Sequence, residues 1–203
     1  IHVDSNTGQN AITVIRGAPA SFTKDEIDIN VIKKSKIFLT QLEIPIDVTL
    51  YCLKKAKESG LVNILNPAPA CKLDKEFFSL ADYFTPNEAE AEFYTGVKIN
   101  NENDAKESAK KLLELGLKKV IITLGEKGLF YSDGKEEIYI KALPFKKVED
   151  TTGAGDAFNG GLAYALSKNK NIKECLNIAN QVAGLSTLKL GAGNSMPSLT
   201  DLK

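Results

Sequence analysis

The sequence predicts an α/β fold with three layers, in which helices cover both faces of a mostly parallel sheet. Short apolar runs alternate with amphipathic stretches along the chain, which is the order that strand–helix–strand units produce. The run KVIITL at 119–124 places valine beside isoleucines without alternation, as in a strand covered on both faces. No linker, repeat or low-complexity tract divides the 203 residues, so we expect a single domain over residues 1–203.

The expected elements follow one another in a regular order. Short runs rich in β-branched or aromatic residues predict strands at 11–16, 36–42, 61–65, 82–85 and 119–124. Apolar residues at helical spacing predict helices at 46–59, 87–95, 102–115, 155–167 and 172–188. Gly60, Gly96 and Gly116 follow three of these helices as stop signals. Around Asp133-Gly134, residues 129–132 and 137–141 form a predicted hairpin.

The composition argues against several classes of function. Lys plus Arg and Asp plus Glu both number 26, so no net charge attracts the chain to nucleic acid or to an anionic membrane. Arg16 is the only arginine and His2 the only histidine, which argues against arginine clamps on phosphate, histidine-based triads and two-histidine zinc sites. No apolar run approaches the ~20 residues that span a bilayer. No secretory signal is visible, so we expect a cytoplasmic protein whose three cysteines are reduced.

The segment DTTGAGDAFNGG at 150–161 holds the strongest candidate site. Gly153, Ala154 and Gly155 permit a tight backbone turn just before a helix, which leaves the first N–H groups of that helix unpaired. Those donors and the positive end of the helix dipole form a site for an anion such as a phosphoryl group. Asp156, beside that anion, is then placed to take a proton from an attacking hydroxyl. Alternatively, Asp156 only caps the helix and the glycines only permit close packing.

Two better-known phosphate-binding loops do not match this segment. A Walker A loop requires G-x-x-x-x-G-K-[ST], and no lysine follows Gly160. A dinucleotide fingerprint requires G-x-G-x-x-G, and Phe158 stands at the third glycine position after Gly153 and Gly155. The segment therefore belongs to neither of these two classes.

Three further segments are weaker candidates, and each has a purely structural alternative. Asn87 and Glu90 face the same way on a helix and suit the water shell of a magnesium ion, or form an ordinary capping box. TLGEKG at 123–128 follows the clearest strand, where α/β proteins gather nucleotides, or is only a hairpin turn. KLGAGNS at 189–195 offers oxygens to a monovalent cation, or is only a glycine C-cap. Together with residues 150–161, these segments describe one site for phosphoryl transfer.

DTTGAGDAFNGG closely resembles the signature of the ribokinase-like (PfkB) family of carbohydrate kinases, whose members have a three-layer α/β fold. Other segments agree with the family in order and spacing over nearly the whole chain: QLEIP at 41–45, LNPAPA at 65–70, TPNEAEAEFYTG at 85–96, ITLGEKG at 122–128 and GAGNSMPS at 191–198. The first two segments resemble the family members that phosphorylate D-ribose more than the fructose or adenosine kinases.

The resemblance implies an enzyme that transfers the γ-phosphoryl group of ATP to the 5-hydroxyl of D-ribose. It implies that Asp156 is the catalytic base, that the N–H groups of Gly153, Ala154 and Gly155 form an anion hole, and that Glu43 lies on the sugar side. The implied ATP contacts are Asn87, Thr123, Gly125, Lys127, Gly128 and Asn180. Glu90, with Asn87, would order Mg²⁺ through water. The residues implied for an activating K⁺ are Asp150, Thr152, Ser186, Lys189, Gly191 and Ser195.

The resemblance also implies an amino-terminal part that this sequence lacks. In the family that part carries a glycine-rich sugar loop and most of a small β-sheet lid, so we expect residues 1–10 to be the end of a lid strand. Relatives often dimerise through the lid, which makes a homodimer the expectation for the full-length protein. The alternatives are the same chemistry on another sugar or a nucleoside, or an inactive nucleotide-binding fragment.

Overall fold

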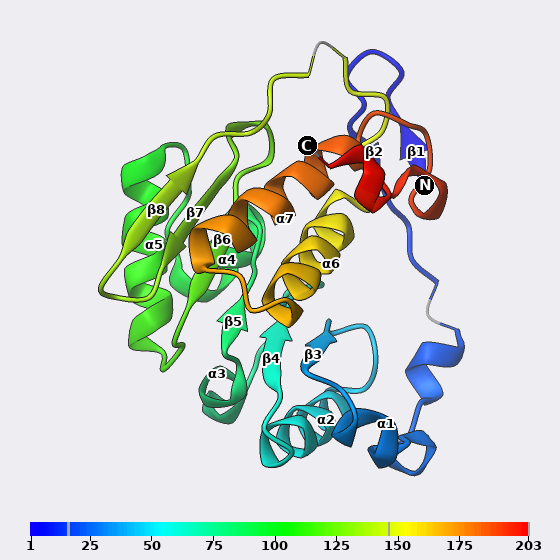
Figure 1. Ribbon diagram of the computed structural model, residues 1–203, viewed down its shortest axis with the longest axis vertical. Coiled ribbons are helices and arrows are strands. Elements are labelled where there is room, and N and C mark those ends of the chain that lie inside the picture. The colour runs from blue at the N-terminus through cyan, green and yellow to red at the C-terminus, as the bar shows by residue number, and fades with distance from the viewer. Residues whose placement is uncertain (16, 146, 203) are drawn as a thin grey trace. The chain divides into compact units, whose positions relative to one another are not determined.

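The computed structural model describes every residue except Arg16, Lys146 and Lys203 (Figure 1). The chain forms two compact units. The first contains residues 1–15, 125–128 and 140–203, and the second contains residues 16–124 and 129–139. The expectation of a single domain stays a prediction, and each unit is described separately below.

A six-stranded sheet with the order β3-β4-β5-β6-β7-β8 forms the centre of the second unit. Its parallel strands are β3 (Ile37–Thr40), β4 (Val62–Leu65), β5 (Tyr83–Phe84) and β6 (Val120–Thr123). β7 (Leu129–Ser132) runs antiparallel to β6, and β8 (Glu137–Ile140) is its neighbour on the other side. The predicted mostly parallel sheet and the late hairpin are therefore confirmed. Leu65 lies beside both Thr40 and Phe84, so the carboxyl ends of the parallel strands meet at one edge.

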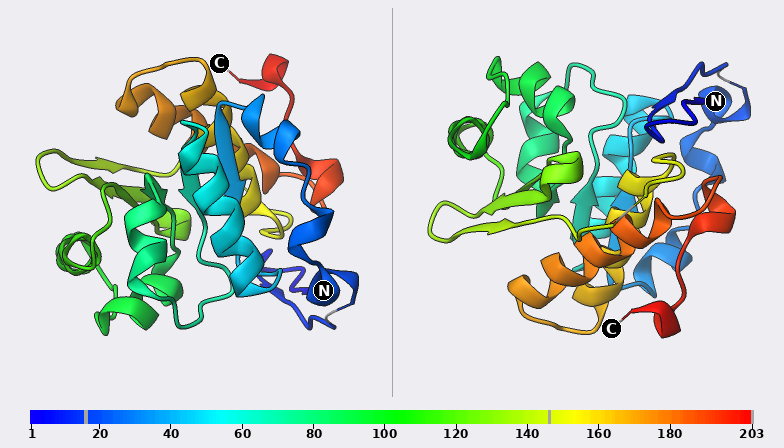
Figure 2. Two further views of the ribbon diagram at one scale, coloured as in Figure 1. Left: turned by 90° about the horizontal axis from the view of Figure 1, so that it is seen from below. Right: turned by 90° about the horizontal axis from the view of Figure 1, so that it is seen from above.

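Helices pack on this sheet through a continuous apolar cluster. They are α2 (Ile46–Glu58), α3 (Lys75–Leu80), α4 (Glu88–Thr95) and α5 (Glu102–Glu114). α1 (Ile29–Lys33) packs instead through a separate small cluster of Ile32, Ala56 and Leu61. Successive parallel strands are added in one direction, so right-handed crossovers place the connecting helices along the same face (Figure 2). Leu53, Phe84, Leu112 and Ile122 are fully buried in the cluster between helices and sheet. Burial of such side chains is the main source of stability in this unit.

The first unit is built around two long helices that lie side by side, α6 (Ala154–Ser167) and α7 (Ile172–Ser186) (Figures 1 and 2). Gly161 permits the close crossing, because a Cβ at this position would lie 3.0 Å from the Ala179 Cα. The same unit contains a two-stranded antiparallel sheet of β1 (His2–Val3) and β2 (Asn10–Ala11). Short 3-10 helices occur in this unit at Gly125–Lys127, Gly193–Ser195 and Leu199–Asp201, and in the second unit at Ala18–Ser21 and Lys24–Glu26.

The prediction of a strand over 11–16 is wrong. Only Asn10–Ala11 is a strand, and Ile12, Val14 and Ile15 are 53%, 70% and 92% exposed. β-Branched residues favour an extended chain, but a strand also needs a neighbour to pair with, and within the described residues the segment 12–15 has none. The last residue of the predicted strand, Arg16, lies outside the described residues.

The helices α1 and α3 were not predicted from the sequence. They have five and six residues, too few to display helical spacing.

The cysteines and the apolar segments were also the subject of predictions. All three cysteines are free thiols, and burial raises the pKa of Cys52 and Cys175. Across the described part of the chain, none of the helices has the length and apolar character required to cross a bilayer.

Asp82 joins three parts of the sheet unit. Its carboxylate accepts hydrogen bonds from the Asn63 N–H at 3.0 Å, from the Lys57 Nζ at 2.6 Å and from the Lys118 Nζ at 3.3 Å. Burial raises the pKa of this carboxyl group, but the hydrogen bonds from Asn63 and the two lysines outweigh burial and hold the pKa below its usual value. The charged form therefore stabilises the fold above the ordinary carboxyl pKa of about 3.9, and this contribution is lost as the pH falls further.

We expect Asp82→Asn to lower the free energy of unfolding by about 1–2 kcal/mol near neutral pH, because hydrogen bonds to a charged acceptor become weaker ones. The difference from the parent protein should shrink as the pH falls from roughly 5 to 3, where Asp82 itself becomes protonated. Urea unfolding at several pH values in this range measures the difference in free energy of unfolding between the variant and the parent protein. Asp47→Asn is the control: Asp47 pairs with Lys24 at 2.8 Å but is exposed, so we expect this variant to lose clearly less stability than Asp82→Asn. Equal losses in both variants, or a difference independent of pH, would contradict the prediction.

Candidate functional site

The first turn of α6 presents backbone that a ligand can approach. Gly153 is the N-cap with a φ of 79°, a left-handed conformation that glycine adopts without strain. Gly155 is exposed, and a Cβ built on it would meet no atom of its own unit within 4 Å. A Cβ on Gly153, by contrast, would lie 3.1 Å from the Ala192 Cβ. The open side of the turn is therefore at Gly155.

The N–H groups of this turn are only partly available to an anion. The Ala154 N–H donates to the Thr151 carbonyl at 3.2 Å, and the Ala157 N–H donates to the Gly153 carbonyl at 2.8 Å. Among the described residues, the N–H groups of Gly153 and Gly155 have no acceptor. Two of the three predicted anion-hole donors are therefore open, and the third, Ala154, is engaged in the turn itself.

Asp156 is the third residue of α6 and its side chain is exposed. A carboxylate in the first turn of a helix is stabilised by the helix dipole, whatever else it does. The same position lies directly beside the open N–H donors of Gly153 and Gly155. The placement agrees with both interpretations of this residue, a base for the attacking hydroxyl and a helix-stabilising side chain.

The buried carboxylate of Asp150 connects the DTTGAGD segment to the segment at 189–195. Asp150 is 2% exposed, and its two oxygens accept hydrogen bonds from the Thr152 N–H and the Gly191 N–H, both at 2.8 Å. The adjacent Thr152 side chain and these two N–H groups hold the pKa of Asp150 below its usual value. Asp150 is therefore charged near neutral pH and fixes the two segments against each other.

Three of the residues predicted to bind K⁺ have buried side-chain hydroxyl groups. The Thr152 Oγ1 is buried and has no partner in hydrogen-bond geometry. Ser186 and Ser195 are both 1% exposed, and their hydroxyls donate to the carbonyls of Ala183 and Ala192, which leaves their oxygens able to bind a cation. Lys189 is exposed, so only its backbone carbonyl suits such a site. A buried oxygen without a partner fits a cation here.

Asn87 and Glu90 form a capping box at the start of α4. The Asn87 Oδ1 accepts from the Glu90 N–H, and the Glu90 Oε2 accepts from the Asn87 N–H, both at 2.8 Å. Glu90 is 8% exposed, and burial raises the pKa of its carboxyl group against the hydrogen bond from Asn87. The pair therefore forms the ordinary capping box that was the structural alternative to a magnesium site. Each side chain keeps one further polar atom, so the cap does not exclude contact with a hydrated ion.

Within the described residues, no group of three or more His, Cys, Asp or Glu side chains is arranged to hold a metal ion directly.

Thr123 and Glu43 also lie at the carboxyl edge of the sheet unit. Thr123 ends β6 and bridges to Asn87, and its N–H donates to the Pro86 carbonyl at 2.9 Å. Glu43 follows β3 and is exposed. The structure therefore brings Asn87, Glu90 and Thr123 together, on the edge where ligands of parallel sheets bind.

The remaining residues of the predicted ATP site belong to the unit of α6 and α7. Lys127 is exposed in the 3-10 turn that Gly125 begins with a φ of 54°. Gly128 is packed against backbone, because a Cβ on it would lie 1.9 Å from the Ile140 carbonyl oxygen. The Asn180 Nδ2 donates to the Lys141 carbonyl at 2.9 Å. Gly128 and Asn180 thus both fix the chain that follows β8.

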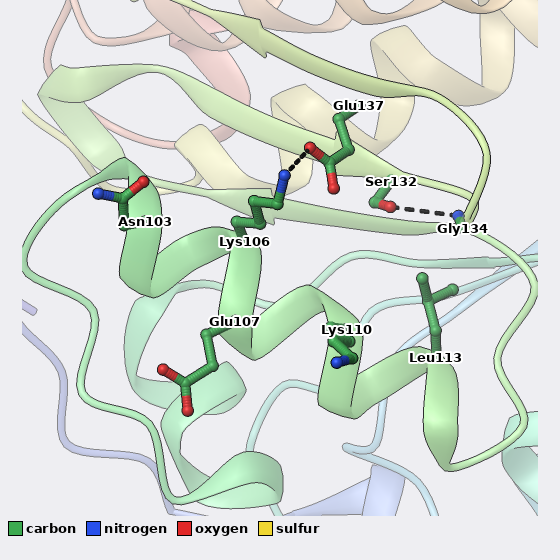
Figure 3. A pocket seen from close by; sticks show the side chains of 8 residues that line it. All are labelled: Asn103, Lys106, Glu107, Lys110, Leu113, Ser132, Gly134 and Glu137. Atoms are coloured by element: carbon green, nitrogen blue, oxygen red, sulfur yellow. Dashed lines mark hydrogen bonds and ion pairs between the residues drawn. The ribbon is translucent and has the colours of Figure 1, made fainter.

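A surface cavity of about 500 Å³ lies between α5 and the β7–β8 hairpin (Figure 3). The Lys106 Nζ and the Glu137 Oε2 form an ion pair across it at 2.6 Å, and Lys110 and Glu107 also line it. None of the predicted site residues lines this cavity. Its two lysines and two glutamates balance, so its charge indicates no class of ligand.

Comparison with known proteins agrees with the fold. The model of the pfkB family of carbohydrate kinases matches residues 1–199. The ribokinase of Staphylococcus aureus (strain COL) is 36% identical over 96% of this chain and 65% of its own length. The deoxyribokinase of Salmonella typhi is 32% identical over 98% of this chain and 65% of its own length. The solved structure of Arabidopsis thaliana ribokinase complexed with ribose and ATP matches with a TM-score of 0.89 at 30% identity, over 95% of this chain and 64% of that one. The chain therefore belongs to the pfkB family of carbohydrate kinases, and it spans slightly less than two thirds of these relatives.

Proposed function

We propose that this chain is the nucleotide-binding and catalytic part of a ribokinase, which transfers the γ-phosphoryl group of ATP to the 5-hydroxyl of D-ribose. Family membership and relatives that bear the name ribokinase support this proposal. The observation that carries it is the first turn of α6. There the open N–H groups of Gly153 and Gly155 stand at the positive end of a 14-residue helix, beside the carboxylate of Asp156.

Phosphoryl transfer depends on positioning and on stabilising charge, and the turn suits both requirements. The N–H groups of Gly153 and Gly155 donate to oxygens of the phosphoryl group as it moves. Asp156 accepts the proton of the sugar hydroxyl while the new oxygen–phosphorus bond forms and the bond to ADP breaks. We assign Glu43 to the sugar side. ATP is assigned to Asn87, Thr123, Gly125, Lys127, Gly128 and Asn180.

We also propose two metal ions for this reaction. Thr152, Ser186 and Ser195 would hold K⁺ through their hydroxyl oxygens, with the carbonyls of Lys189 and Gly191 and the charge of Asp150 close by. Glu90 and Asn87 would contact Mg²⁺ through water, because the capping box occupies one polar atom of each side chain. Mg²⁺ would supply positive charge near the phosphates.

The proposal is tested by offering ATP and a panel of acceptors to the full-length protein: D-ribose, deoxyribose, fructose, a deoxy-sugar acid and adenosine. We expect the largest kcat/KM with D-ribose, formation of D-ribose 5-phosphate by phosphorus NMR, and higher activity in K⁺ than in Na⁺. Deoxyribose is the second candidate, because the Salmonella typhi deoxyribokinase is 32% identical to this chain. A clear preference for another acceptor would overturn the assignment of ribose. Binding of ATP without transfer to any acceptor would favour a nucleotide-binding protein.

A further inference from the structure

Thr151 connects the amino-terminal hairpin to the turn that begins α6. Its N–H and its Oγ1 both donate to the Gly8 carbonyl, at 2.9 and 3.1 Å. Its Oγ1 also accepts a hydrogen bond from the Asn10 Nδ2 at 3.0 Å. Its carbonyl accepts from the Ala154 N–H at 3.2 Å. Every polar group of Thr151 is therefore used, on one side by the hairpin and on the other by the turn.

The hairpin that presents Gly8 and Asn10 is fixed by its own hydrogen bonds. The Asp4 carboxylate accepts from the N–H groups of Asn6 and Thr7 at 2.8 and 3.0 Å, and the Asp4 carbonyl accepts from the Gly8 N–H at 2.8 Å. β1 and β2 close the hairpin on either side of this turn. The hairpin thus offers Thr151 a carbonyl and an amide in a defined position.

Gly8 is the residue that allows the hairpin to approach so closely. Its φ of 71° lies in the left-handed region, and a Cβ on it would lie 2.9 Å from the Val148 Cγ1 and 3.1 Å from the Val148 carbonyl oxygen. A larger residue would be strained at this φ and would push the hairpin away from the chain at Val148. The contact with Thr151 therefore depends on a glycine at this position.

We propose that Gly8 and Asn10 are positioning residues for phosphoryl transfer, which act through Thr151 on the anion-hole turn (Thr151–Gly155). This inference rests on the proposed function. The turn is held twice: Asp150 binds the Thr152 N–H and Gly191 on one side, and Thr151 binds the hairpin on the other. Because the Thr151 carbonyl engages the Ala154 N–H, the position of Thr151 sets how the next N–H group, that of Gly155, is directed.

Loss of this support should lower kcat more than it raises KM. The N–H donors of an anion hole bind most strongly to the phosphoryl group in the transition state, so a misdirected donor weakens transition-state binding more than substrate binding. A displacement of about 1 Å in such a group can cost up to about 10²-fold in rate. Asp150 still holds the turn from its other side, so we expect a smaller loss, of about tenfold.

The test compares four variants of the full-length protein: two single substitutions, their combination and a conservative replacement of Thr151. Thr151→Val removes the hydroxyl that both Gly8 and Asn10 contact while it keeps the shape of the side chain, and Asn10→Leu removes the donating amide. We expect each to lower kcat about tenfold with a smaller change in KM, and the double variant to lose no more than the worse single variant, because both break the same contact. Thr151→Ser keeps the hydroxyl and should restore kcat.

Thr7→Val is the matched control. Thr7 lies in the same hairpin as Gly8 and Asn10. Its hydroxyl has its partners within that hairpin, where it accepts from the Gln9 N–H at 3.3 Å. We expect it to keep parental kcat. Parental kcat in Thr151→Val and Asn10→Leu, or losses that add in the double variant, would overturn the inference while the proposed function stands. If the parent protein phosphorylates no acceptor, amide hydrogen exchange decides: the Ala154 N–H should exchange faster in Thr151→Val and Asn10→Leu than in Thr7→Val, and equal exchange rates overturn the inference.

Discussion

Asp156→Asn, made in the full-length protein, is expected to lower kcat by about 10²–10⁴-fold while ATP binds nearly as tightly as before. An amide of the same shape cannot accept the proton of the sugar hydroxyl, so the chemical step slows without loss of the nucleotide contacts. Steady-state kinetics with D-ribose gives kcat, and calorimetry gives the dissociation constant of ATP. Turnover close to that of the parent protein would remove Asp156 from the role of base.

The control for this variant is Asp47→Asn. Asp47 lies in the first turn of α2 and is exposed, as Asp156 is in α6. Both substitutions remove a negative charge from the positive end of a helix, so both carry any cost of that loss to stability. Only Asp156→Asn should lower kcat. A fall in melting temperature with unchanged kcat in both variants would show that Asp156 only stabilises the start of its helix.

Gly155→Ala is expected to lower kcat by about 10²–10³-fold without lowering the melting temperature. The position is helical, its φ lies outside the left-handed region, and a Cβ meets no atom of its own unit within 4 Å, so the methyl group fits the folded chain. Alanine also favours a helix over glycine by roughly 0.5–1 kcal/mol. The methyl group would, however, occupy the space through which a phosphoryl group reaches the open N–H donors. Kinetics and thermal unfolding measure the two effects separately.

Gly160→Ala is the matched control for Gly155→Ala. Gly160 lies in the same helix and is exposed, and a methyl group would have open space there too, since no atom of its own unit lies within 4 Å of an added Cβ. It should gain the same helix-forming benefit and keep parental kcat. Equal activity in the two variants would mean that the anion does not approach α6 at Gly155.

Local patterns in the sequence predicted the elements that depend on local structure. KVIITL contains β6 (Val120–Thr123), and the helix stops at Gly60, Gly96 and Gly116 coincide with φ values of 79°, 69° and 106°. A left-handed residue after a helix is a local requirement, so the sequence displays it directly. The pair Asn87 and Glu90 is different, because the same spacing serves a capping box and a contact with hydrated Mg²⁺. The structure contains the cap, and the pattern alone could not separate these two roles.

Contacts between distant parts of the chain could not be predicted in the same way. The β-branched residues at 12–15 predicted a strand, but pairing depends on a neighbour that the local pattern does not specify. Thr151 received no role from its sequence context, although it lies between Asp150 and Thr152. Its partners Gly8 and Asn10 are 143 and 141 residues away along the chain. Nothing in the sequence near either end of this contact points to the other end.

The packing of Gly128 changes how inactive alleles of this gene should be interpreted. The resemblance places Gly125 and Gly128 together in one nucleotide loop, yet an added Cβ has open space at Gly125 and collides with the Ile140 carbonyl oxygen at Gly128. Replacement of Gly128 therefore prevents correct assembly of the polypeptide before any nucleotide is met. In a mutational screen, cellular abundance must be measured before a defect at this codon is attributed to impaired use of ATP.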